Sequence, residues 1–259
     1  PEFAREVLRQ FSFEDTLHFF ENIGIAFTDR KGWLYPRSGQ AKSVAELLEG
    51  KARSLKVKIK TKEHVNDVFK KNGVWNVRTE GWTYQGDAVI LANGSKASSV
   101  PGADGSGYRI AAKLGHEIIP PLPALVPLKC KGKNFSGWTG VRTEARISLL
   151  IDGKLIRTET GEIQLTEYGV SGIPVFQISR FAVRAVQKRH KTEILLDFFP
   201  ESTPDETEKL LRRRKAACPY KSGTELLIGL FPEKLCKILC RQPDLIQAIH
   251  GFRLEITGD

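Results

Sequence analysis

The alternation of hydrophobic and polar positions in the first 122 residues predicts helices followed by short strands. Apolar residues recur every three or four positions over residues 12–24, between a Ser12 cap and a closing Gly24, which predicts an amphipathic helix. Residues 41–55 show the same period and predict a second helix. Strict alternation and turn residues then predict five strands, over residues 57–60, 64–70, 74–79, 81–85 and 87–91.

The last of these predicted strands ends in a distinctive way. Residues 88–91 form a continuous apolar run, which breaks into the small residues Ala92, Asn93, Gly94 and Ser95. This pattern is typical of a strand that is buried on both faces and whose end meets a ligand or a helix. Glycine-rich residues then lead into a predicted helix over 109–114, where a plain loop and cap is the simplest interpretation, although its N–H groups could also approach an anion.

The pattern changes after the proline cluster at residues 120–123. Alternating positions predict strands separated by turns, which favours a small barrel or sandwich. A helix is expected over residues 179–187, and a helical period over residues 204–250 suggests an excursion between strands. The predicted strands cover residues 125–129, 139–151, 154–160, 161–166, 193–199 and 252–256.

The composition is that of a soluble globular protein. Hydrophobic residues make up 41% and charged residues 27% of the 259 positions, and no apolar run reaches the roughly 20 residues of a membrane span. The N-terminus lacks the apolar core of a signal peptide, so we expect a cytoplasmic protein without a membrane partner. The four cysteines and five histidines are scattered without ligand spacing, so we expect no metal site.

The net charge of +10 leaves a second interpretation open, in which the chain is a basic binding module, without catalysis, for nucleic acid or another acidic partner. Basic clusters occur at residues 55–62 and 212–215. The first has lysines on one face of a predicted strand without aromatic residues between them, and the second falls late in a predicted helix, where cations are favourable. We therefore do not expect nucleic acid as a partner.

Four motifs occur in one order and resemble a known family. They are ILANGSKASS at 90–99, GADGSGYRIAAKLGH at 102–116, PPLPALVPLK at 120–129 and GEIQLTEYGVSGIPVFQISR at 161–180. This order resembles the bacterial FAD-dependent oxidoreductases described as aminoacetone oxidase-like or bile-acid reductase-like flavoproteins. The resemblance implies an α+β fold, in which a Rossmann-type FAD-binding domain is interrupted by a β-barrel insert domain with an appended helical part.

The resemblance also implies that the chain corresponds to the middle of such a protein. The G-x-G-x-x-G turn of the family and its glycine-rich C-terminal stretch have no match in this sequence. The absence of Met fits either a piece of a longer protein or a sequence with omitted residues. We expect a partial FAD-binding domain over residues 1–122 and an insert domain over 123–259, with its helical excursion at about 204–250.

Seven positions match the cofactor-binding segments of the family, and the resemblance implies that they contact FAD. Asn93 and Ser95 stand where Thr and Gly are usual. Val65 would offer its backbone to the adenine end, or else is an ordinary core valine, and Asp104 can be explained by helix capping alone. The seven positions are Val65, Ala92, Asn93, Gly94, Ser95, Asp104 and Gly105.

The last motif matches the insert-domain signature of the family. From it, Thr166, Glu167 and Ser171 are candidates for the substrate side, with Glu167 in place of the usual His. The alternative interpretation is a glycine-rich turn that closes a barrel. No catalytic residue can be assigned from the sequence.

The predicted function is that of a flavin-dependent oxidoreductase. The resemblance implies hydride transfer through FAD, with NAD(P)H as the reductant and a small molecule as the substrate. If the chain is only the middle of that enzyme, we expect it to be inactive alone.

Overall fold

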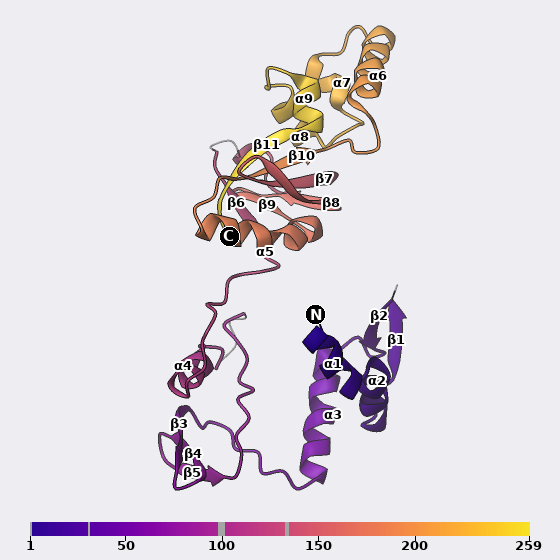
Figure 1. Cartoon of the computed structure of the whole chain (residues 1–259). Helices are drawn as coiled ribbons and strands as arrows, with labels where there is room; N and C mark the ends of the chain where they lie inside the picture. The colour runs from indigo at the N-terminus through magenta and orange to yellow at the C-terminus, as the bar shows by residue number, and fades with distance from the viewer. Residues whose placement is uncertain (1, 31, 98–101, 133–134) are drawn as a thin grey trace. The chain divides into compact units, whose positions relative to one another are not determined.

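A computed structural model of the protein describes residues 2–30, 32–97, 102–132 and 135–259 (Figure 1). Contacts divide the chain into two compact units. The first consists of Pro1–Gly94 and Gly105–His116, and the second of Ser95–Asp104 and Glu117–Asp259. Residues 98 and 99, which end the first of the four motifs, lie outside the described residues.

The first unit begins with helices around a small hairpin. As predicted, Ser12 caps a helix: its Oγ accepts a hydrogen bond from the backbone N–H of Asp15 at 3.1 Å, and Asp15 accepts one in return from Ser12 at 2.8 Å. The predicted helix over residues 41–55 is also confirmed. The elements are α1 (Glu2–Gln10), α2 (Phe13–Asn22), β1 (Phe27–Arg30), β2 (Trp33–Pro36) and α3 (Ala41–Ser54), with β1 and β2 antiparallel.

A three-stranded antiparallel sheet follows in the same unit. It consists of β3 (Val65–Lys71), β4 (Val74–Thr79) and β5 (Thr83–Gly86), and α4 (Ser106–Lys113) packs against β3. Val68 and Ile110 are buried between them, and Asp67 forms an ion pair with Lys113 at 3.4 Å. The sheet and α4 therefore share a small apolar core.

Two predicted strands of this unit, over residues 57–60 and 87–91, are not strands in the structure. Neither segment pairs with another strand within the described residues, so the ladder of hydrogen bonds that defines a strand is not formed. Their apolar side chains remain open to solvent: Val57 is 54% exposed and Ile90 is 89% exposed. Both segments keep an apolar pattern, but they pair with no strand within the described residues.

The second unit contains a closed six-stranded barrel in which all paired strands are antiparallel. Alternate residues point inward, and Ala145, Ile147 and Leu149 have no exposed surface. The strands are β6 (Leu128–Cys130), β7 (Arg142–Ile151), β8 (Lys154–Leu165), β9 (Gly169–Ser171), β10 (Thr192–Asp197) and β11 (Phe252–Gly258), in the order β10-β11-β6-β9-β8-β7.

Two of the differences from the prediction concern β8 and α5. Residues 154–166 were expected as two strands divided at Gly161, but β8 continues through Gly161 to Leu165. The helix expected from residue 179 begins earlier, as α5 (Ile173–Gln187), and it packs mainly on β8, where Ile178 and Ala182 are fully buried. Both differences arise because α5 and β8 pack together, which the local sequence pattern does not reveal.

Helices interrupt the barrel between β10 and β11 (Figure 1). Thr203 caps the first of them through a capping box with Glu206, as its sequence indicates. The helices are α6 (Pro204–Ala217), α7 (Gly223–Leu227), α8 (Glu233–Leu239) and α9 (Leu245–His250), and a short 3-10 turn, η1 (Phe135–Gly137), contacts α8. The mixed α and β composition with a closed barrel confirms the predicted fold class. Within the described residues, no helix combines the length and apolar character of a membrane span.

Candidate functional site

In the first unit, the turn after the apolar run lies against the beginning of α4. A Cβ atom at Gly107 would lie only 2.2 Å from Oδ1 of Asn93, so the Asn93 side chain occupies the space above this glycine. Gly94 has a φ of +70°, and a Cβ atom added at this position would meet no other atom within 4 Å. Asn93 therefore lies against the first turn of α4, although the apolar run before it does not form the predicted strand.

Gly105 occupies the N-cap position of α4 with a φ of +74°, a conformation that favours glycine. Because glycine has no side chain, the N-cap residue supplies no side-chain hydrogen bond to the N–H groups of the first turn. Of these groups, the Tyr108 N–H bonds to the Gly105 carbonyl at 3.1 Å. Small residues and the N-terminus of α4 thus meet at one place.

The other candidate cofactor positions lie in different surroundings. Val65 is half-buried at the beginning of β3, where it pairs with Thr79 just before a register shift. Ser95 and Asp104 belong to the second unit, and Oγ of Ser95 accepts a hydrogen bond from the N–H of Ala97 at 3.2 Å. The first unit thus holds five of the seven candidates, which are Val65, Ala92, Asn93, Gly94 and Gly105. Their contact with a cofactor stays a prediction.

In the second unit, a cavity of about 570 Å³ lies where β8 meets the beginning of α5. Of the three substrate-side candidates, Ser171 lines this cavity. The polar side chains that line it come from β7, β8 and β9, and the apolar ones come from the beginning of α5. The lining consists of Arg142, Thr160, Gly161, Glu162, Gln164, Ser171, Gly172, Ile173, Pro174 and Phe176.

Thr166 and Glu167 do not line the cavity. The Thr166 carbonyl accepts a hydrogen bond from the indole N–H of Trp138 at 3.2 Å, and its Oγ1 accepts one from the N–H of Gly169 at 3.1 Å. Glu167 is exposed beside it. Thr166 therefore holds the turn between β8 and β9, as the alternative interpretation of a barrel-closing turn expects.

The glycines of the signature allow strands to approach closely. A Cβ at Gly169 would lie 2.2 Å from the Leu128 carbonyl oxygen, and one at Gly172 would lie 2.8 Å from the Glu162 carbonyl oxygen. The φ values are +153° and +111°, which side chains rarely adopt. These two positions bring β9 against β6 and β8, and so they shape the cavity at its glycine-rich end.

Sequence reasoning missed several polar residues of the cavity wall. Arg142 forms an ion pair with Glu162 at 3.0 Å across β7 and β8, and Gln164 lies two positions farther along. Thr160, Glu162 and Gln164 share one face of β8 because side chains alternate along a strand. The period-two pattern of residues 160–164 could have found them, but the expected break at Gly161 hid it.

Thiolate and metal chemistry find no support near these positions. Cys130 lies against Gly169, and burial raises the pKa of its thiol to about 12, so it stays protonated at neutral pH. No group of His, Cys, Asp or Glu with metal-ligand geometry occurs within the described residues. The cavity offers hydrogen bonds, an ion pair and apolar surface.

Comparison with known proteins gives a family match over most of the chain. Residues 1–215 match the family described as HI0933-like protein Rossmann domain. The 3-dehydro-bile acid delta(4,6)-reductase of Clostridium scindens is 43% identical over 250 residues, which cover 96% of this chain and 60% of that protein.

Two more distant relatives carry a different name. The ribosomal RNA dihydrouridine synthase of Haemophilus influenzae is 24% identical, with 93% of this chain and 59% of that protein covered. The Escherichia coli protein of the same name is 24% identical, with 70% and 45% covered. The chain thus spans 60% or less of each of these three relatives. The family match over residues 1–215 confirms the resemblance carried by the four motifs, and the chain belongs to the HI0933-like family of Rossmann-domain proteins.

Proposed function

We propose that the chain is part of a flavin-dependent oxidoreductase that reduces a carbon–carbon double bond of a small molecule. The observation that carries this proposal is the 43% identity to a bile acid reductase, along nearly the whole of this chain. The names of all three relatives describe the saturation of a double bond, in a bile acid or in uridine. The proposed cofactor is FAD, with NAD(P)H as the reductant and the bacterial cytoplasm as the location.

The residues present fit FAD at the turn beside α4. Asn93 already fills the space over Gly107, whereas the surroundings of Gly94 are open, so the backbone there can approach a large ligand. The positive end of the α4 dipole, beside the glycine at the N-cap, suits a phosphate. Ala92, Asn93, Gly94 and Gly105 would lie along the cofactor, and Val65 would lie toward its adenine end. When bound, the flavin ring supplies the hydride.

The cavity beside α5 suits the substrate of such a reaction. Ile173 and Phe176 provide apolar surface on which a hydrocarbon skeleton can pack. The Ser171 hydroxyl and the Gln164 amide can donate hydrogen bonds to a carbonyl oxygen, where negative charge develops when hydride adds to a conjugated double bond. In this proposal, Ser171 and Gln164 orient the substrate, and Ile173 and Phe176 hold its apolar part.

A small molecule is favoured over RNA as the substrate. Identity is 43% to the bile acid reductase but 24% to the RNA-modifying relatives. The RNA alternative predicts binding that falls steeply as salt rises.

The experiment is the purification of the full-length protein from its own gene. We expect a flavin absorption spectrum, release of FAD on denaturation, and bleaching of the spectrum by NADH or NADPH without oxygen. A steroid with a conjugated enone should then restore the spectrum, while the saturated steroid should not. A protein without flavin would refute the proposal, and reoxidation by a uridine-containing RNA in place of the enone would assign the RNA activity.

A further inference from the structure

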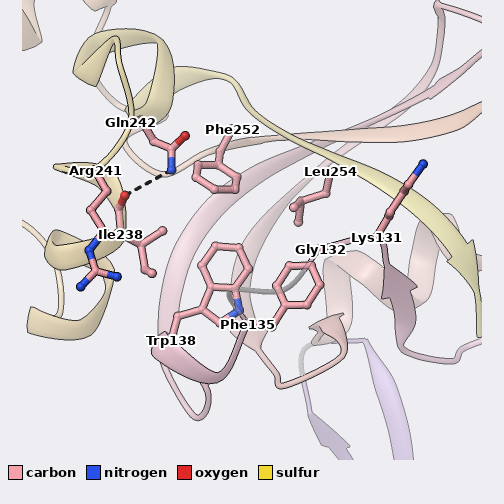
Figure 2. Close-up of a pocket in the computed structure, with 9 residues that line it drawn as sticks. All are labelled: Lys131, Gly132, Phe135, Trp138, Ile238, Arg241, Gln242, Phe252 and Leu254. Atoms are coloured by element: carbon pink, nitrogen blue, oxygen red, sulfur yellow. Dashed lines mark hydrogen bonds between the residues drawn. The ribbon is translucent and has the colours of Figure 1, made fainter.

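A second cavity lies inside the second unit, between the barrel and its helical excursion (Figure 2). It is formed by the residues after β6, by η1, by the end of α8 and by β11. None of its residues lines the cavity beside α5. The lining consists of Lys131, Gly132, Phe135, Trp138, Ile238, Arg241, Gln242, Phe252 and Leu254.

The walls of this cavity are aromatic and aliphatic. The rings of Phe135 and Trp138 are stacked with centroids 5.5 Å apart, and Phe252 lies 5.4 Å from Trp138 at a tilt of 54°. Figure 2 shows these three rings grouped around the space, with Leu254 beside them. Because the Trp138 N–H already donates to Thr166, the indole contributes an apolar face. Rings of this kind favour another ring as the ligand.

The size of the cavity fits one six-membered ring. Its volume is about 140 Å³. Engineered apolar cavities of roughly 150 Å³ bind benzene. Gly132 contributes to this shape, because a Cβ at that position would lie 2.9 Å from the Phe135 ring. A side chain there would displace the ring that forms the wall.

The rim of the cavity carries positive charge. Arg241 is exposed just after α8, and no carboxylate within the described part of the chain pairs with its guanidinium. Lys131, the other cation, is held by Glu255 at 3.4 Å. Gln242 Nε2 donates to the Ile238 carbonyl at 3.4 Å, which leaves its amide oxygen toward solvent or a ligand. A carboxylate at the rim would therefore complement Arg241.

We propose that this cavity is a binding site for a small single-ring aromatic carboxylate, with the ring between Phe135, Trp138 and Phe252 and the carboxylate at Arg241. The site lies apart from the proposed substrate cavity. Ligand binding would fix the excursion onto the barrel, because the walls come from both. The inference stands independently of the flavin proposal.

The test uses the full-length protein and 3-phenylpropionate, with 3-phenylpropanol as the uncharged comparison. Saturation-transfer NMR should give saturable binding of the acid, tighter than that of the alcohol. R241Q should raise the Kd of the acid about tenfold and leave the alcohol unchanged. R213Q, which removes an exposed arginine of α6 outside the cavity, should change neither.

Filling the cavity should abolish binding of both compounds. I238F and L254F each place a ring in the space, and either variant that keeps the wild-type melting temperature serves as the test. If neither folds, the 19F resonance of Trp138 in protein containing 5-fluorotryptophan should shift on titration of the acid. No saturable binding, equal affinity for acid and alcohol, binding that survives a folded filling variant, or an unmoved Trp138 resonance would each overturn the proposal.

Discussion

At the scale of single residues, the glycines of the signature explain more than its polar residues do. Gly169 is required because Leu128 and Cys130 occupy the place of any side chain, and Gly172 because β8 does. Thr166 makes its hydrogen bonds within the turn, and only Ser171 of the three candidates reaches the cavity. The motif therefore mainly serves to close the barrel, and Ser171 is the one of its three candidate residues that lines the cavity.

We predict that Gly169→Ala destabilises the barrel severely, by about 3 kcal/mol or more, because the new Cβ would overlap the Leu128 carbonyl. Urea denaturation of the full-length variant measures the loss. The matched control is Gly258→Ala on β11, where nothing lies within 4 Å of a built Cβ. Equal stability of the two variants would contradict the predicted close approach.

Glu193 should make the stability of the barrel depend on pH. Its burial disfavours the charged form, but hydrogen bonds from Lys191 and Arg253 outweigh burial and lower its pKa below the ordinary 4.5. A lowered pKa in the folded state contributes stability that is present above pH 4.5 and is lost as pH falls through the folded value.

Unfolding midpoints in urea at pH 6 and pH 3.5 measure this contribution. Glu193→Gln should lose stability at pH 6 and differ less from the wild type at pH 3.5. Glu255→Gln, at the paired position of β11 but more exposed, is the comparison. If Glu193→Gln lost more stability at pH 3.5 than at pH 6, the pKa of Glu193 would not be lowered in the folded state.

At the scale of elements, local sequence signals predicted structure well wherever the determining contacts are local. The turn at Asn72 and Gly73 has positive φ at both residues, as its Asn-Gly sequence indicates, and the cap at Ser12 forms as predicted. The break expected at Gly161 is absent, because this glycine serves the packing of Pro174 on β8. The same expected break hid the period-two pattern of Thr160, Glu162 and Gln164, and Arg142 joins them only through the pairing of β7 with β8, which no local pattern reveals.

A series of side-chain hydrogen bonds connects the helical excursion to the barrel. His250 on α9 contacts Asp197 on β10 through Nδ1 at 3.0 Å and Thr207 on α6 through Nε2 at 2.8 Å. Thr207 is fully buried and also donates to Ser202 at 3.2 Å. One histidine thus joins three elements that are far apart in the sequence.

Thr207→Val should therefore destabilise the second unit by about 1–3 kcal/mol, because it leaves a buried histidine nitrogen without its partner. Thermal unfolding of the full-length variant provides the measurement. Thr224→Val on α7 is the control, since the Thr224 hydroxyl makes no hydrogen bond within the described part of the chain. A loss at Thr224 as large as at Thr207 would argue against the chain of hydrogen bonds.

At the scale of the whole molecule, the two units differ in how far their apolar residues are buried. The barrel encloses an apolar core, whereas apolar residues such as Val57 and Ile90 of the first unit are exposed to solvent. The buried core cluster lies in the second unit, whereas Ile25, Val68 and Ile110 are the buried hydrophobic residues described in the first. The motifs identified the family because their order survives in a chain that spans 60% of a relative. The parallel sheet of a Rossmann domain could not be predicted from residues 57–60 and 87–91, because these segments pair with no strand within the described residues.

We predict that the 259-residue chain alone binds FAD weakly, with a Kd well above the micromolar range. The turn beside α4 offers a small surface to a dinucleotide, and residues 87–91, which lead into it, pair with no strand within the described residues. Quenching of flavin fluorescence during titration measures the affinity, and the full-length protein is the comparison. Micromolar or tighter binding by the chain alone would refute this expectation.

The unpaired run at residues 88–91 has a further consequence for handling the chain. An apolar, β-prone segment that pairs with no strand within the described part of the chain can pair with strands of other molecules. Ile90 presents 89% of its surface at the middle of that segment. The chain expressed alone should therefore aggregate as its concentration rises. Replacing Ile90 by a charged residue should slow this aggregation and leave the stability of the barrel unchanged.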